Sequence, residues 1–131
     1  MNLTEKLREC GVVGAGGAGF PTHVKSATRV EFLIANGAEC EPLIHKDAEL
    51  MKHFPAEILS GMTAMMEATG AAGGKFGIKS KNAESLHALQ SQPDARKVEF
   101  VMLPLSEDGE TVTGLMGIME LWPIGTNRSP A

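Results

Sequence analysis

Three short apolar runs, separated from one another by helix-like segments, most constrain the fold of this chain. The runs are residues 30–35, 75–78 and 97–103. Their length and composition are typical of buried strands. After the first run, residues 55–69 carry Pro55 at the first helical position and apolar side chains at helical spacing, and Gly70 ends the segment. After the second run, residues 82–90 begin at Asn82, a favourable N-cap residue.

Strands that alternate with helices of this length form βαβ units, in which successive strands lie parallel in one sheet. We therefore predict an α/β fold, a Rossmann-like layer with a mostly parallel sheet flanked by helices and preceded by a glycine-rich cofactor loop. A first helix begins at Asn2 or Thr4, and a second begins at Pro21. Residues 112–122 are expected to form a short apolar helix. The α/β domain then covers residues 1–122, and residues 123–131 form a loose tail.

Charge, hydropathy and cysteine content exclude several classes of function. The formal net charge is −4, which argues against the clustered basic face that binds nucleic acid. Apolar runs all fall short of the roughly 18 residues of a membrane span, so we expect no direct span. The first ten residues lack the apolar core of a secretory signal, which favours a cytoplasmic protein. Cys10 and Cys40 are the chain's two cysteines; they are expected to be buried, and they form no metal-binding pair.

Residues 11–25 read GVVGAGGAGFPTHVK and contain the glycine-rich loop. The members of a G-x-G-x-x-G pattern are Gly14, Gly16, Gly17 and Gly19. So many glycines indicate that a phosphate or a flat cofactor ring lies directly against the backbone. A dinucleotide fingerprint needs a strand immediately before the pattern, and a helix is predicted there instead. An ordinary Rossmann NAD site is therefore not expected. The alternative is a flexible turn between two helices.

Two further features place polar groups near this loop. Lys25 follows Gly19 by six residues and would supply a countercharge to a bound phosphate or flavin; otherwise it is a surface lysine. Residues 36–42, NGAECEP, come directly after the first predicted strand, at the edge of an open α/β sheet where ligands bind. Carboxylates at Glu39 and Glu41 would accept hydrogen bonds from ribityl or ribose hydroxyls. The alternative is a solvated turn.

Taken together, GAGGAGFPTHVK and NGAECEP resemble the N-terminal flavin-binding region of the C-type component of the Rnf electron transport complex. The chain is also similar to the related corrinoid-reductase and proline-reductase-associated electron-transfer proteins. It is more distantly similar to the NADH-oxidising 51-kDa subunit of respiratory complex I. The resemblance covers residues 8–103. It implies an FMN- and NADH-binding domain that transfers a hydride from NADH to FMN, and then passes electrons to iron–sulfur centres carried elsewhere.

The resemblance also implies roles for individual residues. Gly14, Gly16 and Gly17 would line the FMN, and Lys25 would meet its phosphate or its isoalloxazine edge. The ribityl and phosphate side would be held by Asn36 and Glu39. The nicotinamide of NADH would lie near Phe20, and Glu41 would contact the dinucleotide. Partners would be iron–sulfur electron-transfer subunits or domains, with a membrane-associated complex reached through those partners.

The chain departs from the family pattern at two places. Ala38 stands where the complex I segment has an aspartate, as is usual in the Rnf-like branch. After Leu103 the chain lacks the Tyr-Pro-x-Gly-x-Glu segment that completes the flavin site in the family. The chain also ends before the cysteine-rich cluster segments of such proteins. These departures leave a second hypothesis open, in which the chain is a truncated, non-catalytic α/β remnant that acts as an assembly or interaction module.

Overall fold

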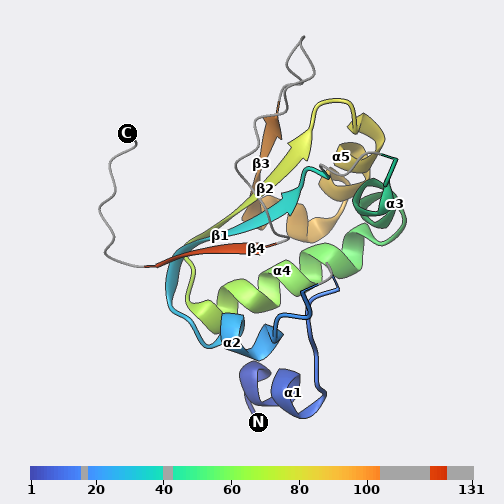
Figure 1. The fold of residues 1–131 in the computed structure, drawn as a ribbon. Coiled ribbons are helices and arrows are strands. Elements are labelled where there is room, and N and C mark those ends of the chain that lie inside the picture. Colours follow the sequence, from blue (N-terminus) through green and yellow to red (C-terminus); the bar gives the residue numbers. More distant parts are fainter. Residues whose placement is uncertain (16–17, 40–42, 104–118, 124–131) are drawn as a thin grey trace, which may run out of the picture.

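The computed structural model describes residues 1–15, 18–39, 43–103 and 119–123. A four-stranded sheet lies at its centre, in the order β3-β2-β1-β4 (Figure 1). The strands are β1 (Val30–Gly37), β2 (Gly73–Lys79), β3 (Val98–Leu103) and β4 (Met119–Pro123). The first three strands are parallel, and β4 pairs with β1 in the antiparallel direction. The predicted α/β fold with a mostly parallel sheet is confirmed.

Helices connect the parallel strands, as the alternating pattern predicts. They are α1 (Leu3–Glu9), α2 (Thr22–Ser26), α3 (Lys46–His53), α4 (Pro55–Thr69), α5 (Ala83–Gln90) and the 3-10 helix η1 (Pro93–Lys97). The chain passes from β1 through α3 and α4 to β2, and from β2 through α5 and η1 to β3. Within the described ranges, no helix is long and apolar enough to cross a membrane.

The core lies between α4 and the sheet. Pro55 occupies the first turn of α4, and Gly70 ends the helix in the left-handed conformation with φ 71°. Leu59, Met62 and Met65 form the buried face of α4. A Cβ atom at Gly74 would lie 2.7 Å from the Met62 methyl carbon, so the methionines of α4 pack directly on the backbone of β2.

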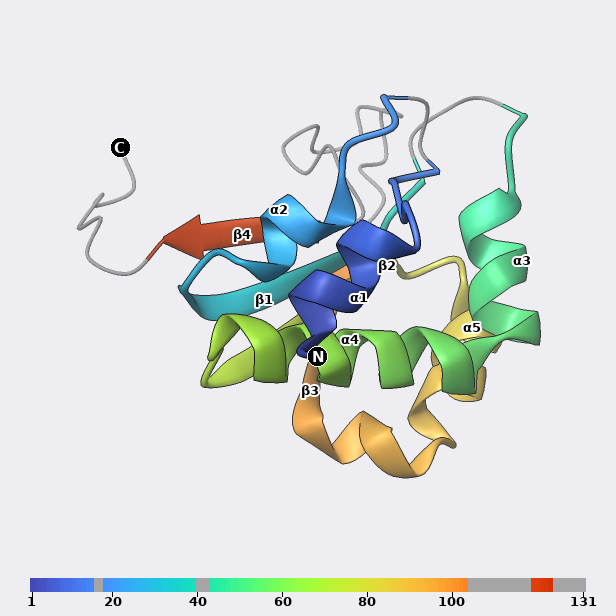
Figure 2. The same ribbon diagram turned by 90° about the horizontal axis from the view of Figure 1, so that it is seen from below.

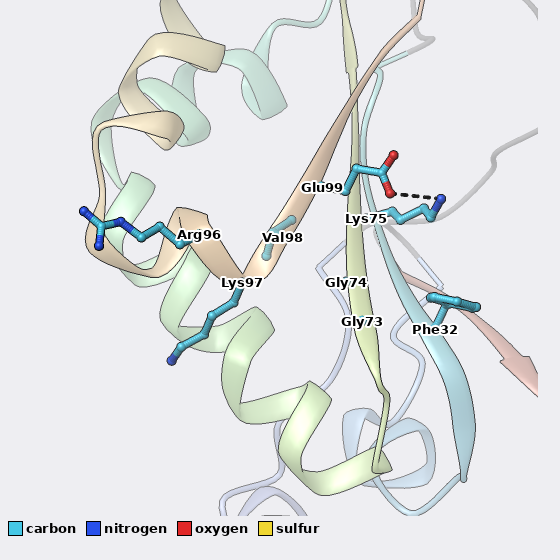
Figure 3. Close-up of a pocket in the computed structure, with 8 residues that line it drawn as sticks. All are labelled: Phe32, Gly73, Gly74, Lys75, Arg96, Lys97, Val98 and Glu99. Atoms are coloured by element: carbon cyan, nitrogen blue, oxygen red, sulfur yellow. Dashed lines mark ion pairs between the residues drawn. The ribbon is translucent and has the colours of Figure 1, made fainter.

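The opposite face of the sheet carries Phe32, Lys75 and Glu99, which point away from α4 (Figure 3). The Lys75 ammonium lies 3.1 Å from the Glu99 carboxylate and 5.9 Å from the centre of the Phe32 ring. A pocket of about 300 Å³ opens here, at the end of the sheet where β2 and β3 begin. The predicted ligand-binding edge is at the other end, where β1 and β2 finish.

Three predictions about local structure need correction. Residues 119–122 belong to β4, so the predicted helix over 112–122 is wrong for them, and the strand continues to Pro123. The remainder of that helix and residues 124–131 lie outside the described residues. Cys10 is exposed rather than buried, because it is the C-cap of α1 at the surface. Pro21 precedes α2 as its N-cap residue instead of occupying its first position.

Candidate functional site

The glycine loop is closed at its base by antiparallel backbone contacts. Val13 and Pro21 form an isolated β-bridge, and the Gly14 amide donates to the Phe20 carbonyl at 2.8 Å. Gly19 adopts a φ of 61°, a conformation that glycine adopts without strain. The loop therefore begins and ends at neighbouring points, with α1 before it and α2 after it. The helix predicted before the loop is confirmed; Gly16 and Gly17 lie outside the described residues.

Asn2 fixes the direction in which the chain enters the loop. Its side-chain oxygen accepts from the Glu5 amide at 2.9 Å, while the Glu5 carboxylate accepts from the Asn2 amide, also at 2.9 Å. This capping box satisfies two free donors at the start of α1. The Thr4 hydroxyl then lies 2.9 Å from the Ser26 hydroxyl, which joins α1 to α2. The two helices that flank the loop are thus held together.

Phe20 and Lys25, both predicted site residues, contact each other. The Lys25 ammonium lies 5.5 Å from the centre of the Phe20 ring, within the range of a cation–π interaction. Phe20 is 47% exposed, so one side of the ring is open to a ligand. Lys25 lies in the last turn of α2 and is half-buried. The end of the glycine loop therefore presents an aromatic surface next to a positive charge.

The turn after β1 contains the next two predicted residues. Asn36 is buried, and its side-chain oxygen accepts from the Ala38 amide at 2.9 Å. This hydrogen bond stabilises the turn two residues ahead, as asparagine side chains commonly do. Gly37 has no space for a side chain, because an added Cβ would lie 2.7 Å from the Met51 sulfur. The turn is therefore fixed both by packing and by hydrogen bonding. Glu41 lies outside the described residues.

The carboxylate of Glu39 is engaged at the start of α3. One oxygen accepts from the Asp47 amide at 2.9 Å, and the other lies 3.3 Å from the Lys46 ammonium. The first of these contacts satisfies a free amide of the helix N-terminus, where a negative charge is favourable. Hydrogen bonding to Asp47, together with the nearby Glu39, raises the pKa of Lys46. Glu39 thus links the turn after β1 to α3.

Lys79 is a candidate that sequence reasoning missed. It is the last residue of β2, only 7% exposed, and its ammonium donates to the carbonyl oxygen of Glu39. Parallel pairing places Asn36 next to Gly77 and Gly37 next to Ile78, so both strands end together. The sequence signal is a lysine that directly follows an apolar run, at the carboxyl end of a predicted parallel strand.

The structure thus brings the predicted residues into two groups. Phe20 and Lys25 form one at the glycine loop; Asn36 and Glu39, joined by Lys79, form the other at the carboxyl ends of β1 and β2. Both views of the fold show the loop on the side of the molecule where β1 ends (Figures 1 and 2). Within the described part of the chain, no three histidine, cysteine or acidic side chains gather as metal ligands.

Comparison with known proteins gives two kinds of relative. The chain is 45% identical over 87 residues to the cobalamin reductase PduS of Salmonella typhimurium, covering 66% of the chain and 19% of that protein. It is 36% identical over 108 residues to the C-type component of the ion-translocating oxidoreductase complex of Pseudomonas aeruginosa, covering 79% of the chain and 14% of that protein. The chain therefore spans a fifth or less of the length of these relatives.

A solved structure shares the fold. It is the NAD+-reducing [NiFe]-hydrogenase in the H2-reduced state, with a TM-score of 0.63, 28% identity, and coverage of 76% of this chain and 20% of that chain. The family model described as the Nuo51 FMN-binding domain matches residues 7–113, which include the glycine loop, the turn after β1 and Lys79. The chain therefore belongs to the Nuo51 FMN-binding domain family of electron-transfer proteins, in which the resemblance of the two sequence motifs had placed it.

Proposed function

We propose that the chain binds FMN between the glycine loop and the carboxyl ends of β1 and β2, and that it oxidises NADH as part of an electron-transfer flavoprotein. The observation that carries this proposal is the family match over residues 7–113, since that range contains both polar groups of the site. Ligands of open α/β sheets bind where the parallel strands end. The loop and the turn after β1 lie at that end.

The residues present fit a flat ring that carries a phosphate. Exposed backbone at Gly14 and Gly19 allows close approach of a ring or a phosphate, as we propose also for Gly16 and Gly17. The buried ammonium of Lys79 donates to a carbonyl and pairs with no described carboxylate, so the same edge of the sheet also suits an anion. In this arrangement Lys25 supplies positive charge from the side of the loop.

Asn36 and Glu39 would hold the ribityl side of FMN. Each carboxylate oxygen of Glu39 has one described partner in the chain, and a carboxylate oxygen accepts about two hydrogen bonds. Glu39 therefore keeps acceptor capacity for a hydroxyl while it holds α3. Phe20 would lie near the nicotinamide of NADH, and Glu41 would contact that dinucleotide. When bound, FMN supplies the redox chemistry, accepting a hydride and releasing electrons singly, and the protein binds and orients both molecules.

The electrons would pass to iron–sulfur subunits or domains. One relative is named as part of an ion-translocating oxidoreductase complex, and another as an NAD+-reducing hydrogenase. We propose that this domain likewise works next to cluster-bearing partners, in the cytoplasm or at the inner face of the membrane through those partners. The cysteines of this chain are Cys10 and Cys40, fewer than the four thiolates that usually hold a cluster.

Flavin titration tests the proposal. Titration of FMN with the 131-residue chain should quench the flavin fluorescence and give a saturable binding curve. Gly14→Val should weaken binding at least ten-fold, because a side chain there would hold the ligand away from the backbone. A Cβ at Gly14 would lie 3.6 Å from its nearest neighbour, so the fold should tolerate it.

Gly61→Ala is the matched control, since Gly61 is an exposed residue of α4 with open space around it. It should leave FMN affinity unchanged. A chain that binds no FMN, or that binds it equally well with and without the Gly14 substitution, would contradict the proposed site. NADH titration of the FMN-loaded chain under anaerobic conditions should bleach the flavin absorption; a stable yellow colour would contradict NADH oxidation.

A further inference from the structure

Lys79 is the most deeply buried charged side chain among those described, with 7% of its surface exposed. It is the last residue of β2, and the alternation of side chains along a strand places it on the face opposite Ile78, which lies in the core. Its ammonium therefore lies at the carboxyl edge of the sheet, on the side away from the α4 methionines. Its hydrogen bond to the Glu39 carbonyl fixes it against the turn after β1.

The pairing of this ammonium is incomplete. An ammonium has three N–H donors, and one of them reaches the Glu39 carbonyl. Every ion pair found within the described residues involves other cations, namely Lys46, Lys52, His53, Lys75 and Lys97. Burying an unpaired charge costs more than a single hydrogen bond to a neutral carbonyl offsets. An anion that approaches the turn would complete the coordination.

The surroundings favour a ligand anion over further protein. Gly77, two residues before Lys79, is paired with Asn36 and adds no side chain between the Asn36 amide and the Lys79 ammonium. The two side chains lie on the same face of neighbouring strands and are both more than nine-tenths buried. An amide donor beside an ammonium suits a phosphate monoester, which carries close to two negative charges and three acceptor oxygens.

We propose that Lys79 binds the phosphate of the flavin nucleotide, an inference that rests on the proposed function. Lys79 then has two roles that depend on one another. Its bond to the Glu39 carbonyl sets the shape of the turn that carries Asn36 and Glu39, and its remaining donors hold the phosphate. The residue would select phosphorylated over unphosphorylated flavin.

Comparison of FMN with riboflavin tests this role, because the two molecules differ only in the phosphate. Lys79→Met removes the charge and keeps the length of the side chain. It should weaken FMN binding by about ten- to one hundred-fold, the loss of a charge-assisted hydrogen bond, and leave riboflavin affinity within about two-fold. Lys81→Met removes an exposed lysine two residues away and should change neither affinity. Fluorescence quenching of each flavin gives the dissociation constants.

The possible results separate the two proposals. A wild-type chain that binds neither flavin contradicts the proposed function. Equal losses for FMN and riboflavin, or no loss for either, contradict the role of Lys79 alone. Weaker NADH binding with unchanged FMN binding would assign the ammonium to the dinucleotide and would also overturn the inference.

A second measurement covers a variant that fails to fold. Inorganic phosphate should raise the melting temperature of the wild-type chain, compared with chloride at equal ionic strength, and should not raise that of Lys79→Gln. Circular dichroism of each variant without ligand shows whether it is folded. Equal stabilisation of both chains by phosphate would place the anion elsewhere.

Discussion

At the scale of single residues, Gly37 shows how tightly the site is joined to the core. An added Cβ would lie 2.7 Å from the Met51 sulfur, 2.8 Å from a Phe76 ring carbon and 3.1 Å from the Gly77 carbonyl oxygen. Gly37→Ala should therefore lower the free energy of unfolding by about 1–3 kcal/mol, the usual cost of overpacking. Urea denaturation measures the change.

Gly61→Ala provides the comparison for this substitution. Gly61 lies in the interior of α4 with nothing within 4 Å of an added Cβ. Alanine there should raise stability by roughly 0.5–1 kcal/mol, because glycine is the poorer helix former. If Gly37→Ala proved as stable as Gly61→Ala, the end of β1 would be less tightly packed than the structure indicates.

Residue-level prediction from the sequence succeeded where one side chain decides the local conformation. Asn2 was one of two N-cap candidates, and it forms a complete capping box. The engagement of Glu39 at α3, and the burial of Lys79, were not predicted. Both depend on contacts between segments far apart in the sequence, because Lys79 is 40 residues from its acceptor Glu39. A sequence pattern contains no information about such a contact until the strand register is known.

At the scale of elements, α3 depends on a residue outside the helix. His45, its N-cap residue, makes no side-chain capping hydrogen bond. Glu39 supplies the acceptor for the Asp47 amide instead. Glu39→Ala should therefore lower stability by about 1 kcal/mol, the typical effect of losing a helix cap, and should speed hydrogen exchange of the Asp47 amide. Glu67→Ala, which removes an exposed carboxylate from α4, should do neither. Unchanged exchange at Asp47 would mean that water caps α3 equally well.

The parallel part of the sheet was predictable because its strands and helices alternate in sequence order. The residues of α4 were predicted in full, since a proline at its start and a glycine at its end mark both boundaries. Strand β4 was predicted as part of a helix. Its antiparallel partner β1 lies more than eighty residues earlier in the chain, and a short apolar run does not by itself distinguish a strand from a buried helix.

At the scale of the whole molecule, β4 closes one edge of the sheet. Residues 119–123 pair with β1 from Val30 to Ala35, which covers hydrogen-bonding groups that would otherwise lie open. An exposed, apolar edge strand pairs readily with another chain. A chain ending at residue 103 should therefore melt at least about 5 °C lower than the full chain and should elute as a dimer or larger species.

A chain ending at residue 123 is the matched control, because it keeps β4 and removes only the residues after it. It should melt and elute as the full chain does. Leu121→Pro in the full chain provides a second test, since Leu121 is paired with Leu33 and proline cannot donate to a ladder hydrogen bond. It should lower the melting temperature without shortening the chain. If the chain of 103 residues stayed monomeric with an unchanged melting temperature, β1 would be protected by something other than β4, and the sheet edge would play no part in holding the turn that carries Asn36 and Glu39.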